Sequence, residues 1–184
     1  SYITGVRAAD EESYWIITHT SKFGTYHVFK LDAIGLSTTP VISAIGSTPT
    51  SPWGRLKVSP DGKYVAISTV NSANDFVEVY RFDNSSGILS GEDQILSECG
   101  SLGFEFSPDN TKFYATGCNW ELYQYDLTAG TPEQIHASRV QINPPQQQFV
   151  EPALQLGPDG KIYITDEYYL DIINSPNLKG TACD

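Results

Sequence analysis

One strand-turn-strand phrase recurs along the chain at a fixed interval, and it constrains the fold more than any other feature. The phrase reads Ser59-Pro-Asp-Gly-Lys-Tyr-Val-Ala-Ile-Ser68, and it returns at 107–116 and 157–165. A further copy at 12–18 lacks the Pro-Asp-Gly turn. The residue that opens the second strand of each copy recurs every 49 positions, at Trp15, Tyr64, Phe113 and Ile162. A period of this length with four strands per repeat is typical of a β-propeller.

Each repeat divides into four strand-like pieces. The first piece alternates apolar and polar residues, as at 102–106, and the second is continuously apolar, as at 64–69. The third piece, as at 77–82, is clear, and weaker fourth pieces fall at 41–45, 94–96 and 133–136. The sequence therefore predicts an all-β protein with four-stranded antiparallel blades. The expected boundaries are about 1–49, 50–98 and 99–148, with an incomplete fourth blade at about 149–184.

The number of repeats raises the question of closure. Propellers typically close with four to eight blades, and an open arc would expose a blade face at each end. We therefore expect about four blades that form an incomplete arc of a larger propeller, with seven blades as the expected total. A closed four-bladed ring and an arc completed by another chain remain as alternatives.

The turns of the repeat contain acidic residues that a reader could take for metal ligands. Proline presets the backbone for the first central position of a turn, and glycine or asparagine then adopts the left-handed conformation. The sequence pattern therefore predicts hairpin turns, with turn aspartates that accept backbone hydrogen bonds, at Asp61, Asp109 and Asp159.

Charge and composition exclude some classes of protein. The hydrophobic share of 40% and the aromatic share of 12% indicate a globular chain rather than a disordered one. A net charge of −11 argues against sequence-independent nucleic-acid binding, which needs Lys and Arg to neutralise phosphates. No apolar run approaches the roughly 18 residues that would span a membrane. These features suit a soluble protein outside the cell or in contact with cations.

Several phrases together resemble one family. They are Tyr14-Trp-Ile-Ile-Thr-His-Thr20, the segments at 54–63, 77–84, 87–89, 103–109, 122–127 and 154–163, and the ending at 173–177 and 180–183. They are similar to the WD-like propeller region of large secreted proteins of gliding Gram-negative bacteria. Those proteins commonly end in a gliding-motility-associated, type B sorting domain of the type IX secretion system. The resemblance implies further blades, secretion and an extracellular or cell-surface location. It implies no catalytic residues.

The repeat alignment also singles out candidate site residues. His19, Ser68, Gly117 and Asp166 occupy the same place in successive repeats, and Thr20, Thr69, Cys118 and Glu167 follow them. Equivalent positions of a propeller form a ring at one depth, so these residues are candidates for its rim or channel. The adjacent acids Asp166 and Glu167 are weak candidates for binding a cation, with a solvated rim as the alternative. His27 and His136 fall in different blades, which does not favour a metal site.

A second, shorter likeness suggests an enzyme. The hairpin 157–166 looks like a strand pair of gluconolactonase-type propellers, in which an Asp binds calcium and acts in lactone hydrolysis. Such a site needs several convergent carboxylates and amides, whereas the equivalent positions of the other repeats are His19, Ser68 and Gly117. We therefore expect no catalytic residues and no cofactor, with calcium as the one candidate ion.

The cysteines suggest a disulfide. Counting outward from the turn at 108–110 places Cys99 and Cys118 nearly opposite each other at the open end of a hairpin. The sequence predicts a bond between them, which suits an oxidising, extracellular setting, while two buried thiols are the alternative. Cys183 would then pair, if at all, outside this sequence.

The interpretation favoured by these features is a non-catalytic β-propeller module for binding, adhesion or scaffolding in a secreted or cell-surface bacterial protein. The expected partners are a protein or glycan ligand at the cell surface, and either the remaining blades or a partner chain. A calcium-dependent, lactonase-like hydrolase and a structural subunit of an extracellular assembly are the alternatives.

Overall fold

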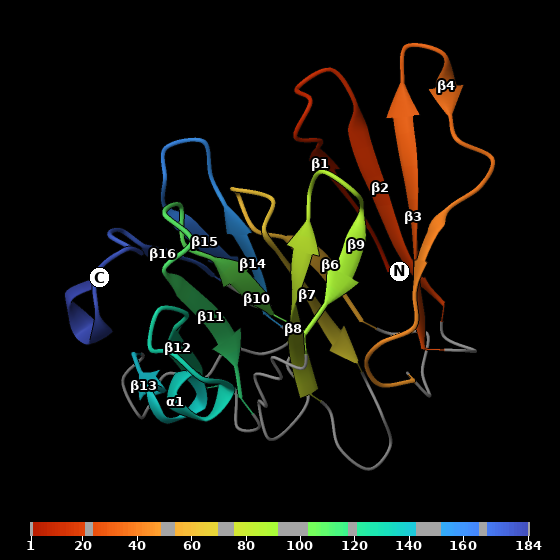
Figure 1. Ribbon diagram of the computed structural model, residues 1–184. Coiled ribbons are helices and arrows are strands. Elements are labelled where there is room, and N and C mark those ends of the chain that lie inside the picture. Colours follow the sequence, from red (N-terminus) through yellow and green to blue (C-terminus); the bar gives the residue numbers. More distant parts are fainter. Residues whose placement is uncertain are drawn as a thin grey trace. The chain divides into compact units, whose positions relative to one another are not determined.

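The computed structural model describes residues 2–20, 24–48, 54–69, 76–91, 103–117, 121–142, 152–165 and 169–183. These residues form four small antiparallel sheets (Figure 1). The chain divides into two compact units, one with residues 1–73 and 78–94, the other with residues 74–77 and 95–184. We call them unit 1 and unit 2 and describe each by itself.

Unit 1 contains the first two sheets, save for the first two residues of β8. In the second sheet the strands lie side by side in chain order, whereas in the first the last strand returns to pair with the third. The first sheet comprises β1 (Ile3–Arg7), β2 (Tyr14–Thr20), β3 (Thr25–Asp32), β4 (Gly35–Leu36) and β5 (Val41–Ser43), with both β4 and β5 paired to β3. The second comprises β6 (Leu56–Val58), β7 (Tyr64–Thr69), β8 (Phe76–Asp83) and β9 (Ile88–Ser90).

Unit 2 contains the third and fourth sheets. The third comprises β10 (Phe104–Phe106), β11 (Lys112–Thr116), β12 (Leu122–Asp126) and β13 (Val140–Gln141), with the helix α1 (Pro132–Ala137) between the last two strands. The fourth comprises β14 (Ala153–Leu156), β15 (Ile162–Thr165) and β16 (Leu170–Ile173), followed by the short 3-10 helix η1 (Gly180–Cys183). Four up-and-down sheets confirm the predicted all-β, propeller-type class.

The predicted fourth strand at 133–136 is wrong, because these residues form α1. Pro132 opens the helix, Thr131 caps it, and Gln134 completes the capping box. The outer strand of the third sheet is instead β13. In the second sheet β9 pairs with β8, while the predicted strand at 94–96 lies outside the described residues.

The hairpin turns follow the predicted chemistry. Gly62, Asn110 and Gly160 all have left-handed backbones, with φ of 69°, 63° and 78°. Asp61 Oδ1 accepts hydrogen bonds from Ser59 Oγ at 2.7 Å and from Lys63 N at 3.1 Å. The corresponding carboxylates of the other two turns accept the backbone N–H two residues on in the same way. These aspartates are turn residues, as predicted.

The core of unit 1 lies between its two sheets. Trp15 and Ile17 on β2 are buried against residues of the second sheet such as Ile67, and β1 lies beside β6. Trp15 Nε1 donates to Asn84 O at 2.8 Å, and Asn84 Nδ2 donates to Arg7 O at 2.9 Å. The two sheets are thus joined by an apolar layer and by polar contacts at its edge.

Unit 2 repeats this arrangement. Tyr114 and Leu122 of the third sheet pack with residues of the fourth such as Leu154, and β10 lies beside β14. Glu105 Oε2, which is buried on β10, accepts the backbone N–H of Leu156 on β14 at 2.9 Å. Within the described part of the chain, no helix is long and apolar enough to cross a membrane.

Candidate functional site

His19, a predicted rim residue, lies near the end of β2 and is only 7% exposed. Its ring packs edge-on against Tyr26, with ring centres 4.5 Å apart, and against Tyr2 at 5.7 Å. Burial, assisted by the nearby charge of His27, lowers the pKa of His19 to about 4. The structure therefore places a neutral, packed imidazole at this position.

Ser68, the equivalent residue of the second sheet, is also buried. Its Oγ accepts the backbone N–H of Arg55 at 3.0 Å, and its own N–H donates to Arg55 O at 2.9 Å. A side chain at Gly54 would collide with Ser68 O and with the ring of Tyr2. Tyr2 therefore packs close to both predicted rim residues of unit 1.

A buried polar cluster continues from His19 into unit 1. Tyr26 and Tyr80 lie with ring centres 5.7 Å apart, and Glu78 accepts hydrogen bonds from Ser47 Oγ at 2.7 Å and Ser47 N at 3.2 Å. Burial and the Glu78 charge raise the pKa of Tyr80 far above its usual value, so its hydroxyl stays protonated.

Among the described residues no group of three or more His, Cys, Asp or Glu side chains could hold a metal ion.

The remaining predicted positions belong to unit 2. Gly117 donates its N–H to Glu121 O at 2.7 Å, and a side chain there would collide with the ring of Tyr123. Asp166 and Glu167 lie outside the described residues, so their rim or metal role stays a prediction.

The predicted disulfide stays a prediction for the same reason. Cys99 and Cys118 both lie outside the described residues, although the described part of the hairpin is paired, with Phe106 opposite Phe113 and Phe104 opposite Ala115. Cys183 is buried in the core of unit 2.

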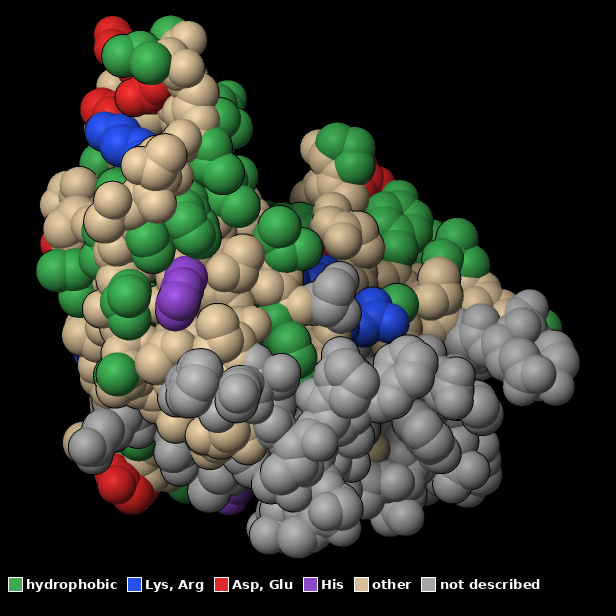
Figure 2. All heavy atoms as spheres, turned by 90° about the vertical axis from the view of Figure 1, so that its right-hand side faces the viewer, with side chains coloured by type: hydrophobic (Ala, Val, Ile, Leu, Met, Phe, Trp, Pro, Cys, Tyr) green, Lys and Arg blue, Asp and Glu red, His purple; other side chains and the backbone are tan. Residues whose placement is uncertain are grey.

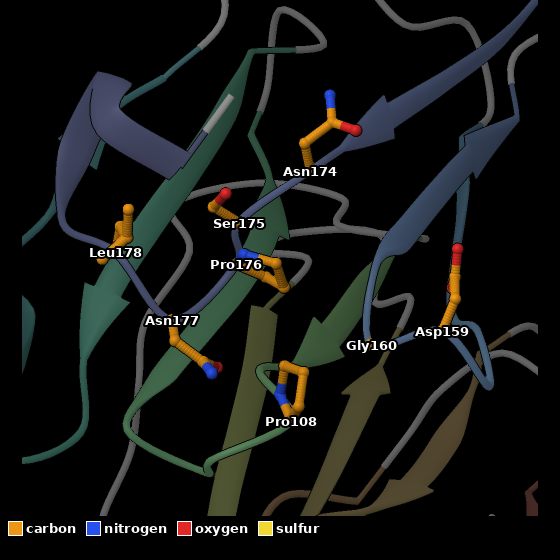
Figure 3. Close-up of a pocket in the computed structure, with 8 residues that line it drawn as sticks. All are labelled: Pro108, Asp159, Gly160, Asn174, Ser175, Pro176, Asn177 and Leu178. Carbon is orange, nitrogen blue, oxygen red and sulfur yellow. The ribbon is translucent and has the colours of Figure 1, made fainter.

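Unit 2 contains a cavity of about 450 Å³ that the repeat analysis did not find (Figure 3). It lies among the hairpin turn of the third sheet, the hairpin turn of the fourth and the segment that follows β16. Its lining residues are Pro108, Asp159, Gly160, Asn174, Ser175, Pro176, Asn177 and Leu178. Figure 3 shows Pro176 and Asn177 turned toward Pro108.

The segment 174–178 is fixed in place by Gln124, a buried residue of β12. Gln124 Nε2 donates to Leu178 O and to Tyr114 Oη, both at 2.7 Å, and Gln124 Oε1 accepts from Gly180 N at 2.8 Å. Tyr114 Oη in turn donates to Pro176 O at 2.7 Å. Two carbonyls of the segment are therefore bonded to the third sheet, which makes this wall of the cavity rigid.

Unit 1 carries a different feature, an exposed apolar sheet face. Strand pairing puts Tyr14, Leu31 and Leu36 in one row and Ile3 and Ile42 in another, all on the side of the first sheet opposite Trp15 and Ile17. We call these five residues the outer apolar face. Ile3 is 58% exposed and Ile42 is 59% exposed. Figure 2 shows hydrophobic side chains gathered over this sheet.

Charge is distributed unevenly around this face. None of the strand residues of the first sheet that point to this side is Asp or Glu, although the chain carries 22 acidic residues. Its one strong charge is Arg7, at the end of β1. An exposed apolar surface that lacks acids in an otherwise acidic protein has the composition of an interface.

Neither feature was identified from the sequence, for different reasons. The outer apolar face follows from strand alternation, and Tyr14, Ile16 and Thr18 already indicate it once β2 is placed. The cavity depends on a loop, 174–178, whose position is set by a hydrogen bond between Leu178 and Gln124, which lies 54 positions earlier. No local pattern carries that information.

Comparison with solved structures agrees with the observed topology. The β-propeller domain of Cps50 (Swd1) from Myceliophthora thermophila matches with a TM-score of 0.55 at 15% identity, over 92% of this chain and 52% of that one. An auxiliary nutrient binding protein from Bacteroides thetaiotaomicron matches with a TM-score of 0.58 at 13% identity, over 93% and 37%. A candidate 6-phosphogluconolactonase from Bacteroides uniformis matches with a TM-score of 0.52 at 17% identity, over 92% and 49%.

The shared feature is the β-propeller fold. At such low identities the likeness shows the fold alone, and proteins with very different titles share it. The chain spans between about a third and about half of the length of the solved structures named above. No protein-family model matches the sequence, and no curated protein matches it.

Proposed function

We propose that this chain is a non-catalytic binding and scaffold module of a secreted or cell-surface bacterial protein. The outer apolar face carries the proposal. Five apolar side chains lie on one side of an antiparallel sheet, and no strand residue that points to this side is Asp or Glu. They form a surface that a protein partner would bury.

The secreted setting rests on the sequence. The phrases similar to gliding-motility-associated, type IX-secreted proteins support it, and so does the net charge of −11. In that setting the partner of the outer apolar face is another chain of a surface assembly, and the contact would act in adhesion or assembly.

The face is suited to a protein partner rather than to a small molecule. It is a sheet surface whose apolar residues are spread over β1 to β5, whereas small ligands are bound in concave sites. Apolar surfaces with few charges are typical of the centres of protein–protein interfaces.

Photo-crosslinking in the cells that produce the protein tests this proposal. A benzophenone amino acid replaces Leu36 on the outer apolar face or, as the control, Ile88 on β9, which is 48% exposed. We expect a discrete crosslinked protein from position 36 that is absent from position 88. Crosslinks of equal yield from both positions, or none from position 36, would refute the proposal.

A calcium-dependent lactonase is the alternative, and an activity assay on the same protein tests it. The substrate is glucono-δ-lactone with added calcium, and the variant is Asp166→Asn. Hydrolysis that requires calcium and disappears in this variant would replace the binding proposal with an enzymatic one. We expect no calcium-dependent hydrolysis above the buffer rate.

A further inference from the structure

The cavity of unit 2 has a chemistry that the outer apolar face does not share. Its polar side chains are the Asp159 carboxylate, the amides of Asn174 and Asn177 and the hydroxyl of Ser175. Its apolar lining consists of Pro108, Pro176 and the exposed Leu178, and at Gly160 a side chain would meet only the Pro108 ring, at 3.9 Å. A few fixed polar groups around a partly apolar hollow are the usual composition of a small-ligand site.

The hydrogen bonds already made within unit 2 fix the orientation of these groups. Asn174 Oδ1 accepts from Lys161 Nζ at 2.9 Å, and Asn177 Oδ1 accepts from Asp109 N at 3.3 Å. Each amide is thereby oriented with its Nδ2 still able to donate two hydrogen bonds. In the described part of the chain neither Nδ2 makes a hydrogen bond.

Asp159 supplies the complementary acceptor. Its Oδ2 accepts from Tyr163 Oη at 2.8 Å, and its Oδ1 accepts from Lys161 N at 3.3 Å. The hydrogen bond from Tyr163 is the main reason why the pKa of Asp159 is lowered, so the group is ionised at neutral pH. Each carboxylate oxygen retains a further lone pair for a ligand.

These groups narrow the class of ligand. An anion would meet the Asp159 charge in a protein of net charge −11. A divalent cation would find a single carboxylate here, and the described residues contain no multi-ligand metal cluster. A peptide strand is bound along an open strand edge, whereas this cavity is lined by turns and a loop. A neutral hydroxyl both donates and accepts, which matches amide donors placed beside a carboxylate acceptor.

We propose that this cavity binds a neutral sugar ring. Its hydroxyls donate to Asp159 and accept from the amides of Asn174 and Asn177, and its C–H face lies on Pro108 and Pro176. The site is formed by unit 2 and does not depend on the outer apolar face of unit 1.

Saturation-transfer NMR on the full chain tests the site. The probes are glucose, galactose, mannose, xylose and N-acetylglucosamine, each titrated into the millimolar range, and N-acetyl-dialanine amide represents a peptide backbone. The variants are Asp159→Asn and Asn177→Ala. The matched control is Asp61→Asn, which changes the same turn motif in unit 1 at a residue that does not line the cavity.

We expect at least one sugar to bind saturably and to bind about tenfold more weakly in both cavity variants, since each loses a hydrogen bond to a fixed group. Asp61→Asn should leave the affinity unchanged, and unaltered circular dichroism would show that the variants fold. Three results would each overturn the proposal: no saturable sugar binding, sugar affinity that neither cavity variant changes, or tighter binding of the dialanine amide than of any sugar.

Discussion

Replacement of Gln124 by Ala would test whether one buried amide holds the cavity wall together. Gln124 is 3% exposed and makes three hydrogen bonds, to Tyr114 Oη, Leu178 O and Gly180 N. A net contribution of roughly 1 kcal/mol for each bond gives a loss of about 3 kcal/mol in the free energy of unfolding. Part of this loss falls on residues 174–183, because two of the three partners lie there.

Hydrogen exchange measured by mass spectrometry, together with urea denaturation, provides the assay. If the lost stability resides in the segment, amides of 174–183 should exchange on the order of a hundredfold faster in Gln124→Ala. The control is Gln155→Ala, at an exposed glutamine of β14, which should change stability by less than about 0.5 kcal/mol. A loss below about 1 kcal/mol for Gln124→Ala, with unchanged exchange at 174–183, would refute the reasoning.

Three further predictions follow from the structure. Burial lowers the pKa of His19 to about 4, whereas the unfolded chain has a value near ~6.5, so the unfolded state takes up the proton first and stability falls as pH drops from about 6.5 to about 4. Urea denaturation at pH 7 and at pH 4.5 should show this loss of stability, on the order of 2 kcal/mol with an allowance for the partly solvated ring edge. The variant His19→Phe should lack this pH-dependent loss. If the variant kept the pH dependence of the parent, the burial of His19 would be contradicted. Gly160→Ala should cost about 1 kcal/mol of stability, because only the left-handed backbone disfavours alanine there. Gly62→Ala should cost about 2 to 3 kcal/mol, because the added methyl group would also lie 2.5 Å from Asn84 Nδ2. Equal decreases in the melting temperature of the two variants would contradict this. Peptide mapping without reductant should recover a linked Cys99–Cys118 peptide, and full alkylation of both thiols would reject the disulfide.

The strand-turn-strand core was predictable because local chemistry specifies it. The Pro-Asp-Gly turns determine where the first two strands of a repeat meet, and Gly62 and Gly160 adopt the left-handed backbone that this motif requires. Hydrophobic alternation then fixes which side chains are buried, as it does for Trp15 and Ile17. These signals act over a few residues, so each repeat of the sequence carries them independently of the others.

The outer strands were less predictable because they carry weak patterns. Residues 133–136 contain a strand-like Gln-Ile-His, yet Pro132 and the Thr131–Gln134 capping box specify a helix. Pro and capping signals decide short segments that have little apolar content. The sequence signal for α1 was therefore present but was outweighed by the expectation of a regular repeat.

The site residues show the limits of aligning repeats. The alignment placed His19 and Ser68 at equivalent positions, and the structure puts both at the ends of second strands. It could not show that Tyr2 packs close to them or that Tyr26 packs edge-on against His19, because those contacts come from outside the aligned phrase. Equivalent positions identify a depth in the blade, whereas burial depends on the neighbours at that depth.

The proposed function requires that the outer apolar face of the first sheet binds a protein. The most direct test is the affinity of the partner identified by crosslinking for two variants, Ile42→Arg on that face and Ile88→Arg on the second sheet. Both residues are exposed, so both variants should fold. We predict that Ile42→Arg weakens binding by about a hundredfold, since a charge would be buried unpaired in the interface, while Ile88→Arg binds as the parent does. Equal affinities for the two variants would contradict the claim.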